Sequence, residues 1–286
     1  SREVIGKTPF DLSTEEHRRF LKLNIKQLLI QDYRVFEGMY QAKDGRKVPV
    51  LIHGNTLLDE NGKQIGHFGF VTDLTEQKRS LMVAGDVQRN LMPQPPPRIK
   101  GLDIAGNSVP CDEIGGDYYD FIEIRRGQIP MLAVAVGDIS GHGVDSALLM
   151  ATARAVFRNH IFTTGDLSGV VAGMNRTLLK DFYSLDRFMT LFAMEIDPLK
   201  GELRWVRAGH DPALVYRRKN ASFIELNGDG VSLGLFENHT YYQNELPDLS
   251  AGTVIALGTD GIWEAHARNG EMFGKNRFRN IIETNA

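Results

Sequence analysis

Apolar and polar residues alternate over three stretches near the start of the chain, and β-branched and aromatic side chains are frequent there. Such alternation is typical of half-buried β-strands. The three stretches are YRVFEGMYQA (33–42), KVPVLIHGNTLL (47–58) and QIGHFGFVTDL (64–74). The short sequences KDG and ENG separate them, and both are typical of turns. The pattern therefore predicts an antiparallel three-stranded meander.

A helix is predicted on each side of this meander, because apolar residues recur there at helical spacing. Ser13 stands three residues before Glu16, which is the spacing of a capping box at a helix start. The apolar residues on one face of this first helix are Phe20, Leu21, Ile25, Leu28 and Leu29. The second helix covers 75–91, and the sequence PQPPP at 93–97 ends it, because proline removes backbone donors.

The second helix carries a partial heptad pattern. Its seam positions are Leu74, Leu81, Ala84 and Leu91, and Gln77 and Gln88 interrupt them. One interpretation is a signalling helix that pairs with a second copy, which would make the protein a homodimer through its first unit and this helix. The other is an ordinary helix between two domains. Two heptads are too few to decide between them.

The rest of the chain combines several strand patterns with two long helical patterns. The predicted strands are 118–124, 131–138, 187–197, 202–209, 213–218 and 253–260. The helices begin near Gly143 and cover 167–182. Their apolar stripes are Val144, Ala147, Leu148, Ala151 and Ala155 in the first, and Val170, Val171, Met174, Leu178 and Leu179 in the second. Two helices among many strands predict an α+β layered sandwich rather than alternating βαβ units.

These patterns divide the chain into a first unit at 1–74, a linker helix with a proline-rich spacer at 75–98, and a second unit at 99–286. The length of 286 residues fits this division, since a globular domain averages ~150 residues. The net charge of −3 gives no reason to expect binding to nucleic acid or to an anionic membrane.

Cysteine content and hydropathy indicate the compartment. The lone Cys111 excludes an internal disulfide framework and fits a reducing environment. No apolar run approaches the ~18 residues of a membrane span. We therefore expect a cytoplasmic protein. Because the first residue is Ser1 rather than methionine, we also expect the sequence to be part of a longer chain.

Three aspartates occupy similar positions beside strands of the second unit. Asp138 ends the apolar run MLAVAVG and precedes ISGHG, Asp260 ends TVIALGT, and Asp117 follows EIGG and opens a strand. A charged group at the edge of a core is costly unless it is paired or binds a cation. Each aspartate alone would be interpreted as a turn or cap residue. The three together favour a shared site.

Oxygen ligands without a histidine or cysteine cluster favour a hard cation, Mg²⁺ or Mn²⁺, over zinc. Two such ions that share carboxylates lie about 3.5–4 Å apart, lower the pKa of a bridging water toward ~7 and support phosphoryl chemistry. Two further residues are weaker candidates. His142 is either a general acid or phosphate contact, or a solvated loop residue. Asp211, which follows His210, either joins the metal site or forms a turn.

Several segments resemble, in order and spacing, the bacterial SpoIIE-type branch of the metal-dependent PPM protein phosphatases. They are IGGDYYDF, VGDISGHGVDSALLMA, RFMTLFAMEIDPLKGELRWVRAGHDPAL and LGTDGIWEAHARNGEMFGKNRF, and the likeness covers about 87–282. Upstream, SREVIGKTPFDLSTEEHRRF and KDGRKVPVLIHGNTLLDENGKQIGHFGFVTDLTEQK resemble the latter part of a PAS sensor domain. The usual first two PAS strands would precede Ser1.

The resemblance implies an α-β-β-α sandwich that holds two Mn²⁺ or Mg²⁺ ions and removes phosphate from phosphoserine or phosphothreonine on a protein. The usual substrate in this branch is a phosphorylated anti-sigma-factor antagonist. Asp138 matches the metal-bridging aspartate, and Ile139 supplies a ligating backbone carbonyl. Asp117 and Asp260 match the remaining acidic positions. Asp211 stands where relatives often carry asparagine or proline.

The leading hypothesis is thus a sensor-regulated protein phosphatase with Asp117, Asp138 and Asp260 as its catalytic residues. One alternative is a signalling scaffold that binds the phosphoprotein without turning it over. The three aspartates count against it, since a binding module has no need of desolvated acids at strand ends. The other alternative, a hydrolase of small phosphate esters, stays open because the substrate surface cannot be recognised in the sequence.

Overall fold

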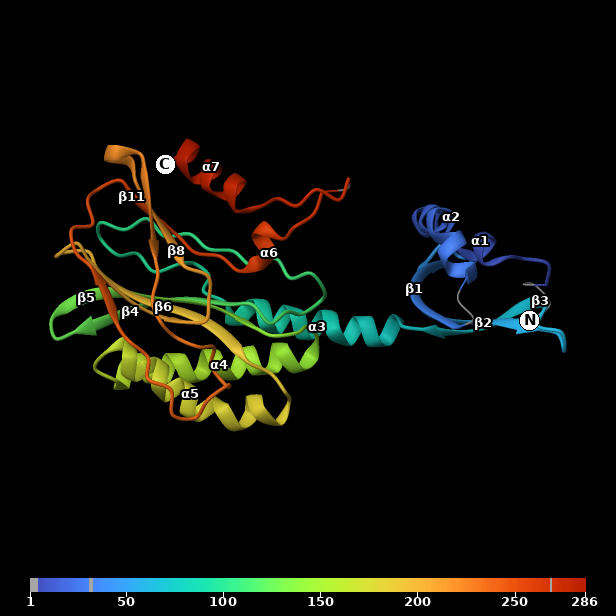
Figure 1. The fold of residues 1–286 in the computed structure, drawn as a ribbon, viewed down its shortest axis with the longest axis horizontal. Helices are drawn as coiled ribbons and strands as arrows, with labels where there is room; N and C mark the ends of the chain where they lie inside the picture. Colours follow the sequence, from blue (N-terminus) through green and yellow to red (C-terminus); the bar gives the residue numbers. More distant parts are fainter. Residues whose placement is uncertain (1–4, 31–32, 268) are drawn as a thin grey trace. The chain divides into compact units, whose positions relative to one another are not determined.

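The computed structural model describes residues 5–30, 33–267 and 269–286, and its contacts divide the chain into two compact units, Ser1–Val83 and Ala84–Ala286 (Figure 1). The boundary falls within helix α3 (Thr75–Leu91), which the sequence predicted with the same ends. The division into 1–74, 75–98 and 99–286 stays a prediction.

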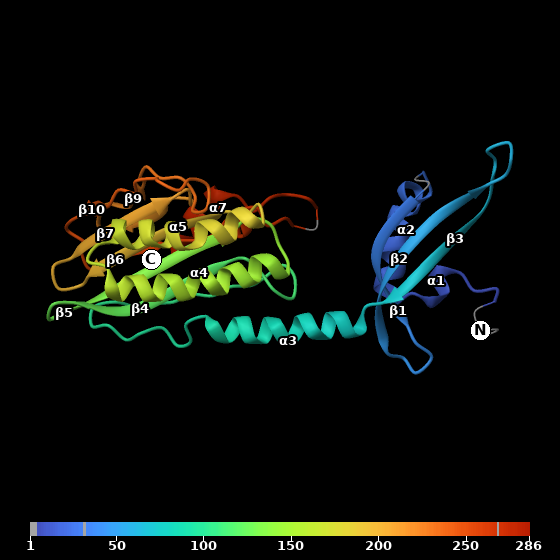
Figure 2. The ribbon, with the colours of Figure 1, turned by 90° about the horizontal axis from the view of Figure 1, so that it is seen from below.

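The first unit is a three-stranded antiparallel sheet with helices α1 (Pro9–Leu12) and α2 (Glu15–Ile30), as Figure 2 shows. The strands are β1 (Tyr33–Gln41), β2 (Lys47–Leu58) and β3 (Gln64–Asp73), paired in the order β1-β2-β3. The predicted meander is confirmed. Its core contains Leu21 from α2 and Val50 and Ile52 from β2, all of them buried.

The start of α2 differs from the sequence prediction by one residue. Thr14, not Ser13, precedes the helix, and its hydroxyl oxygen accepts a hydrogen bond of 3.4 Å from the backbone of His17. Ser13 instead ends α1, and its hydroxyl donates to the carbonyl of Pro9 at 2.7 Å. Ser13 and Thr14 are both good N-cap residues. The sequence alone therefore could not show which of the two caps α2, or that a short helix ends at Ser13. Of the apolar face, Leu21 is buried and Phe20 is half-exposed, while the side chains of Ile25, Leu28 and Leu29 lie outside those that the structure describes.

The second half of α3 is fixed to the segment that follows it. Gly85 is buried against the chain at Glu113, and a β-carbon on Gly85 would lie 2.2 Å from the Glu113 carbonyl oxygen. Gln88 makes two hydrogen bonds to Gly115: its amide donates to the carbonyl at 2.7 Å and its oxygen accepts from the backbone N–H at 3.1 Å. Gln88 is therefore an anchor of α3, not an interruption of a dimer seam.

The second unit contains two antiparallel sheets. The first has the strand order β10-β7-β6-β5-β4 and the second the order β11-β8-β9. The strands are β4 (Tyr118–Arg126), β5 (Ile129–Ile139), β6 (Met189–Asp197), β7 (Glu202–Ala208), β8 (Ala213–Arg217), β9 (Ser222–Leu226), β10 (Asn244–Leu246) and β11 (Thr253–Ala256). The sequence analysis missed the two short strands β9 and β10.

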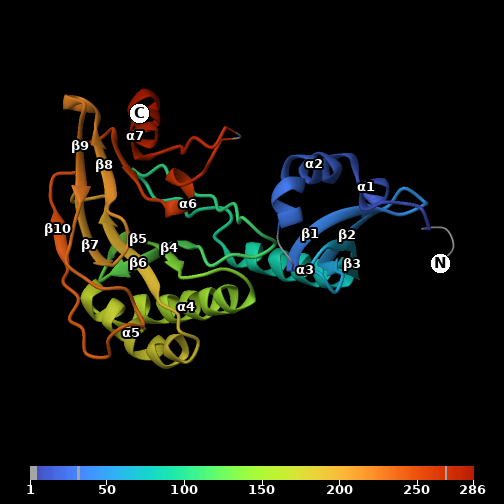
Figure 3. The same ribbon diagram turned by 45° about the vertical axis from the view of Figure 1, so that its right-hand side comes forward.

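Helices complete an α-β-β-α arrangement in this unit. Figure 1 shows α4 (Val144–Thr163) and α5 (Leu167–Ser184) on one side of the five-stranded sheet, with α6 (Asp260–Trp263) and α7 (Lys275–Asn285) on the side of the three-stranded sheet. Figure 3 shows the same layers from another angle. One core, with Phe157 and Phe182, lies between the two long helices and the large sheet, and a second, with Phe192 and Val215, lies between the sheets. The α+β sandwich prediction is confirmed.

The predicted apolar stripe of α4 is wrong. Val144 is 51% exposed and Leu148 is 65% exposed. The residues that α4 buries are Ser146, Leu149, Met150, Ala153, Phe157 and Ile161. Apolar residues occur around most of the circumference of this helix, so their spacing could not identify the inward face. The larger side chains face the sheet, because they bury more apolar area than the alanines of the predicted stripe.

Candidate active site

Strand pairing brings Asp117 and Asp138 together. Tyr118, the first residue of β4, pairs with Gly137 of β5, so Asp117 lies beside the next residue of β5, Asp138. The two carboxyl groups lie close enough for each to act on the pKa of the other. Sequence reasoning could place both residues at strand ends, but only the register of β4 against β5 makes them neighbours.

Asp260 reaches the same place from the other sheet. It begins α6, four residues after β11 ends at Ala256, and its charge acts on both Asp117 and Asp138. Thr259, the preceding residue, donates a hydrogen bond of 3.1 Å from its hydroxyl to the Asp117 carboxylate. The structure thus gathers the three predicted aspartates at one end of the sandwich. Asp260 is the most exposed of them.

The environment of Asp117 and Asp138 disfavours the ionisation of their carboxyl groups. Burial, followed by the charges of Asp117 and Asp260, raises the pKa of Asp138 to about 7. Burial also raises the pKa of Asp117, against the lowering effect of the Thr259 hydroxyl, and the charge of Asp260 adds to the increase. Carboxyl groups whose pKa is raised by burial and by neighbouring carboxylates are typical of functional sites.

Glycine allows the chain before Asp117 to approach β5. A β-carbon on Gly116 would lie 2.8 Å from the carbonyl oxygen of Ile139 and 3.4 Å from the Ser146 side chain. Ile139 itself is fully buried, so its carbonyl cannot move away easily. This close approach explains why Gly116, a residue without a side chain, stands next to Asp117.

We expect Gly116→Ala to lower the free energy of unfolding by about 1–3 kcal/mol, since an extra methyl group must displace packed backbone. The displaced Ile139 carbonyl should also reduce phosphatase activity more than the loss of folded protein accounts for. Thermal unfolding and activity assays on the same preparation measure both effects. Gly115→Ala is the matched control, because a β-carbon there makes an ordinary contact of 3.4 Å with Pro110. Equal behaviour of the two variants would contradict the role given to Gly116.

A glycine loop joins β5 to α4, and an ion pair holds it. Arg187 donates to the Asp145 carboxylate at the start of α4, at 2.9 Å from Nε, and its guanidinium lies against Gly141. Gly141 has a φ of +82°, so both its conformation and its neighbour exclude a side chain. The backbone N–H of Ser140 donates to the Phe188 carbonyl at 2.9 Å, and the Ser140 hydroxyl accepts from the Phe188 N–H at 3.0 Å.

The two weaker candidates are not brought into this carboxylate group. His142 is 89% exposed, and its Nδ1 lies 3.8 Å from a carboxylate oxygen of Asp112. Asp211 forms an ion pair of 2.6 Å with Lys275, the first residue of α7. Lys275 also lies 4.7 Å above the centre of the Trp263 ring. A metal role for Asp211 would require this ion pair to open.

Sequence reasoning missed a buried histidine close to the carboxylates. His210 is 4% exposed and follows β7, and burial lowers the pKa of its imidazole. The motif RAGHDPAL places it in a turn, and nothing in that motif shows that the ring lies between two sheets. This histidine, its partner Thr190 on β6, and Thr259, which donates to Asp117, are polar contacts of the site that the sequence did not indicate.

The donor chemistry fits a hard cation that keeps part of its water. Among residues 5–30, 33–267 and 269–286, no group of three His, Cys, Asp or Glu side chains has the arrangement needed to hold a metal ion. Asp117 and Asp138 are partly buried and Asp260 is exposed, so the carboxylates form an open set. Mg²⁺ is commonly bound by one or two carboxylates together with several waters and substrate phosphate oxygens. The mutual repulsion of the carboxylates is what such an ion relieves.

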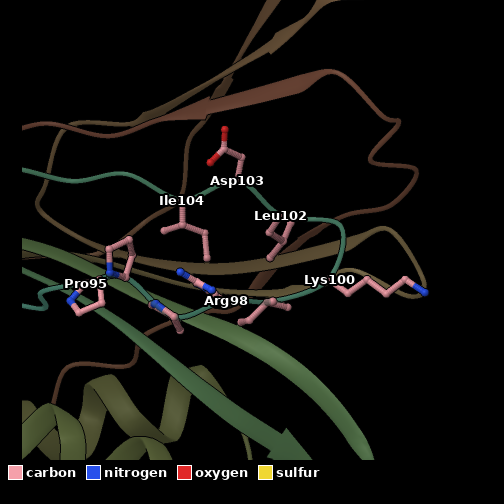
Figure 4. A pocket seen from close by; sticks show the side chains of 9 residues that line it. Pro95, Arg98, Lys100, Leu102, Asp103 and Ile104 are labelled. Atoms are coloured by element: carbon pink, nitrogen blue, oxygen red, sulfur yellow. The ribbon is translucent and has the colours of Figure 1, made fainter.

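The cavity in Figure 4 lies elsewhere. It has a volume of about 360 Å³ and is formed by the segment that follows α3. Its lining residues are Pro95, Pro96, Pro97, Arg98, Ile99, Lys100, Leu102, Asp103 and Ile104. None of the three aspartates lines this cavity. At the carboxylate site, Asp260 is exposed and Asp117 and Asp138 are partly buried.

Comparison with known proteins agrees with this architecture. The family model described as "Stage II sporulation protein E (SpoIIE)" matches residues 131–286, and a model of the PAS fold matches residues 1–79. The chain is 29% identical over 195 residues to Phosphoserine phosphatase RsbU of Bacillus subtilis, covering 68% of this chain and 56% of that protein. It is 25% identical over 200 residues to Phosphoserine phosphatase RsbP of the same organism, covering 66% of this chain and 46% of that one.

A solved structure shares the fold of the second unit. The SiaA-PP2C domain of Pseudomonas aeruginosa superimposes with a TM-score of 0.59 at 22% identity, over 74% of this chain and 83% of that one. The chain thus has a PAS-like N-terminal region followed by a PP2C-like phosphatase fold. It spans about half the length of RsbU and RsbP. Within the described residues, no helix has the length and apolar character that crossing a membrane demands.

Proposed function

Because the chain belongs to the SpoIIE family, we propose that its second unit is a metal-dependent phosphatase that acts on phosphoserine or phosphothreonine of a partner protein. The observation that carries this proposal is the carboxylate group of Asp117, Asp138 and Asp260. Burial and the charge of Asp260 raise the pKa of both Asp117 and Asp138 at one end of the sandwich. The similarity to RsbU and RsbP supports a serine phosphatase regulated by an attached unit.

The residues that would hold Mn²⁺ or Mg²⁺ are the three aspartates and the backbone carbonyl of Ile139. When bound, two such ions supply an activated water and neutralise charge on the phosphoryl group. The chain's own part is to hold the ligands in place. Gly116 lets Asp117 approach β5, and Thr259 orients the Asp117 carboxylate. Asp138 must release a proton to ligate, so metal affinity should fall as the pH drops below about 7.

The proposed substrate is a phosphorylated anti-sigma-factor antagonist in the cytoplasm. This rests on the resemblance of the motifs IGGDYYDF and GDISGHG to SpoIIE-type phosphatases. Neither a nucleic acid nor a membrane is proposed as a partner. The alternatives are a scaffold that binds the phosphoprotein without hydrolysis, and a hydrolase of small phosphate esters.

Metal removal tests the proposal. We expect Mn²⁺ or Mg²⁺ to be required for release of phosphate from a phosphoserine protein, and excess chelator to stop the reaction, because carboxylate ligands hold hard cations. Released phosphate is measured with a panel of phosphoproteins from the source organism and, in parallel, with para-nitrophenyl phosphate. Turnover that persists after dialysis against chelator would exclude the metal mechanism. Binding of the phosphoprotein without turnover would favour the scaffold, and turnover of the small ester alone would favour the third hypothesis.

We also propose that the protein is a homodimer that pairs through the PAS-like unit and α3. Of the predicted seam, Leu74 is buried within its own unit, and Leu81 and Leu91 are half-buried. Ala84, the remaining seam residue, is exposed. Helix α3 also exposes Met82, Val83 and Val87, each by more than half. These three side chains, together with Ala84 of the predicted seam, are available to a second copy.

Val83→Glu combined with Val87→Glu should convert the proposed dimer to a monomer, because two like charges would then face each other across the pairing helix. Mass measurement by light scattering over a range of protein concentrations checks this. Gln77→Glu, on another face of the helix, should leave the mass unchanged. A double variant with the same mass as the wild type would show that α3 does not pair in this way.

A further inference from the structure

The imidazole of His210 connects the two sheets directly behind the carboxylates. Its Nδ1 lies 2.8 Å from the hydroxyl oxygen of Thr190 on β6, in the five-stranded sheet. Its Nε2 lies 3.2 Å from the carbonyl oxygen of Gly258, which follows β11 of the three-stranded sheet. Both ring nitrogens are therefore used, one toward each sheet.

Chemistry assigns the direction of these two hydrogen bonds. A carbonyl oxygen can only accept, so Nε2 carries the hydrogen and donates to Gly258. In the neutral ring, Nδ1 then accepts from the Thr190 hydroxyl. A buried imidazole with both nitrogens satisfied has one orientation, because turning the ring would leave two buried polar atoms without partners.

Each end of this connection is next to a carboxylate. Thr190 pairs with Asp138 in the register of β5 against β6, and its hydroxyl lies 3.4 Å from the Asp138 carbonyl. Gly258 stands two residues before Asp260. Between them, Thr259 donates to Asp117. The segment that carries Asp260 is thus attached to β6 through His210 and to Asp117 through Thr259.

The backbone of His210 is fixed independently of that segment. Gly209, with a φ of +71°, donates from its N–H to the Gly230 carbonyl at 3.0 Å. Arg207 donates from Nε to the carbonyl of His210. The histidine is therefore a rigid support, whereas residues 257–259 have left the strand β11 and have not yet entered α6.

We infer that His210 is a positioning residue that holds Asp260 at a fixed place relative to Asp138, and thereby sets the affinity of the carboxylate group for a divalent cation. The inference rests on the proposed function, since it concerns the same site. A histidine that only filled the core would affect the stability of the fold without a separate effect on cation binding. Loss of the Nε2 hydrogen bond releases the segment that carries Asp260 and Thr259, and leaves the strand that carries Asp138 in place.

Calorimetric titration with Mn²⁺, with no substrate present, tests this inference. We expect His210→Ala and Thr190→Val each to raise the Mn²⁺ dissociation constant about 10–100-fold, the range found for supports of metal ligands. His210→Gln keeps an N–H near the position of Nε2 and Thr190→Ser keeps the hydroxyl, so both should remain within a few-fold of the wild type. The double variant His210→Ala/Thr190→Val should bind Mn²⁺ no more weakly than His210→Ala, because the two substitutions break the same connection between the sheets. His160→Ala, whose ring lies against Gly173 between α4 and α5, is the control and should not change Mn²⁺ affinity.

Three outcomes would overturn the inference: a folded His210→Ala variant with wild-type Mn²⁺ affinity, equal loss of affinity in His160→Ala, or failure of the wild type to bind Mn²⁺. Should His210→Ala not fold, Thr190→Val and His210→Gln carry the test, and the expected contrast between them is the same. A wild type that binds Mn²⁺ but hydrolyses no phosphoprotein would refute the proposed function alone, because the titration does not depend on turnover.

Discussion

Asp138→Asn is expected to reduce hydrolysis of a phosphoprotein by more than about 100-fold, since replacing even an indirect support of a metal ligand commonly costs about 10–100-fold. Asp138 lies beside Asp117, the residue before β4, and the charges of Asp117 and Asp260 both act on it. Asparagine keeps the shape of the side chain and removes the charge that a cation needs. Initial rates at saturating Mn²⁺ measure the effect, and Asp103→Asn, an exposed aspartate, is the control. A variant that retained wild-type rates would make Asp138 a turn residue.

The same substitution should stabilise the protein in the absence of metal. The ordinary pKa of an aspartate is 3.8, and burial and the neighbouring charges raise the pKa of Asp138 to about 7 in the folded state. Between these two values the folded state binds more protons than the unfolded state, so stability falls as the pH rises from about 4 to about 7. Above that range the wild type carries the full cost of the buried charge, and Asp138→Asn carries none.

Thermal unfolding in chelator at pH 5 and pH 8 checks this expectation. At pH 8 the variant should exceed the wild type by about 1–2 kcal/mol, less than the full pKa change implies, because water screens a partly exposed carboxylate. At pH 5 the two should be close. Saturating Mn²⁺ should reverse the order at pH 8, since it stabilises the wild type by mass action. A variant less stable than the metal-free wild type at pH 8 would contradict this account of the site.

Arg158→Leu is expected to lower the free energy of unfolding by about 3–5 kcal/mol, the usual cost of leaving a buried charge without its partner. Asp120 on β4 is completely buried. It accepts two hydrogen bonds of 2.7 Å from the Arg158 guanidinium and one of 2.9 Å from the Tyr118 hydroxyl. Leucine replaces the apolar part of arginine, so most of the loss should come from the unpaired carboxylate.

Urea unfolding at neutral pH measures this loss. Arg89→Leu breaks an ion pair with Asp86 in which both side chains are more than half exposed, and such a pair contributes about 0–1 kcal/mol. If both leucine variants lost the same stability at neutral pH, the buried ion pair would have no special role.

The elements that the sequence predicted well are those whose pattern depends on local spacing. The strands β1, β2 and β3 and the helix α3 agree closely with their predicted ranges, because alternation and helical periodicity are local signals. The prediction of the buried face of α4 was wrong, because a helix that is apolar on nearly every side does not indicate which face packs against the sheet. The three aspartates could be predicted as candidates from strand ends and glycines. Their contact could not, because it depends on strand register.

The role of His210 illustrates what a single sequence does not contain. Its partners, Thr190 and Gly258, are 20 residues before it and 48 residues after it. Each belongs to a different sheet, so only the packing of the two sheets brings them to one ring. Asp211, its neighbour in the chain, was the more obvious candidate, yet the structure pairs it with Lys275. Neighbouring positions in a turn can thus point to different layers of the fold.

The two hydrogen bonds between Gln88 and Gly115 attach α3 to the chain very close to Asp117. Only Gly116 separates the anchored residue from Asp117. A slide of the helix by a single residue would carry Gln88 about 1.5 Å along its axis, which is more than a hydrogen bond tolerates. The intervening chain is too short to absorb that displacement. A shift of α3 along its axis would therefore be transmitted to the position of the Asp117 carboxylate.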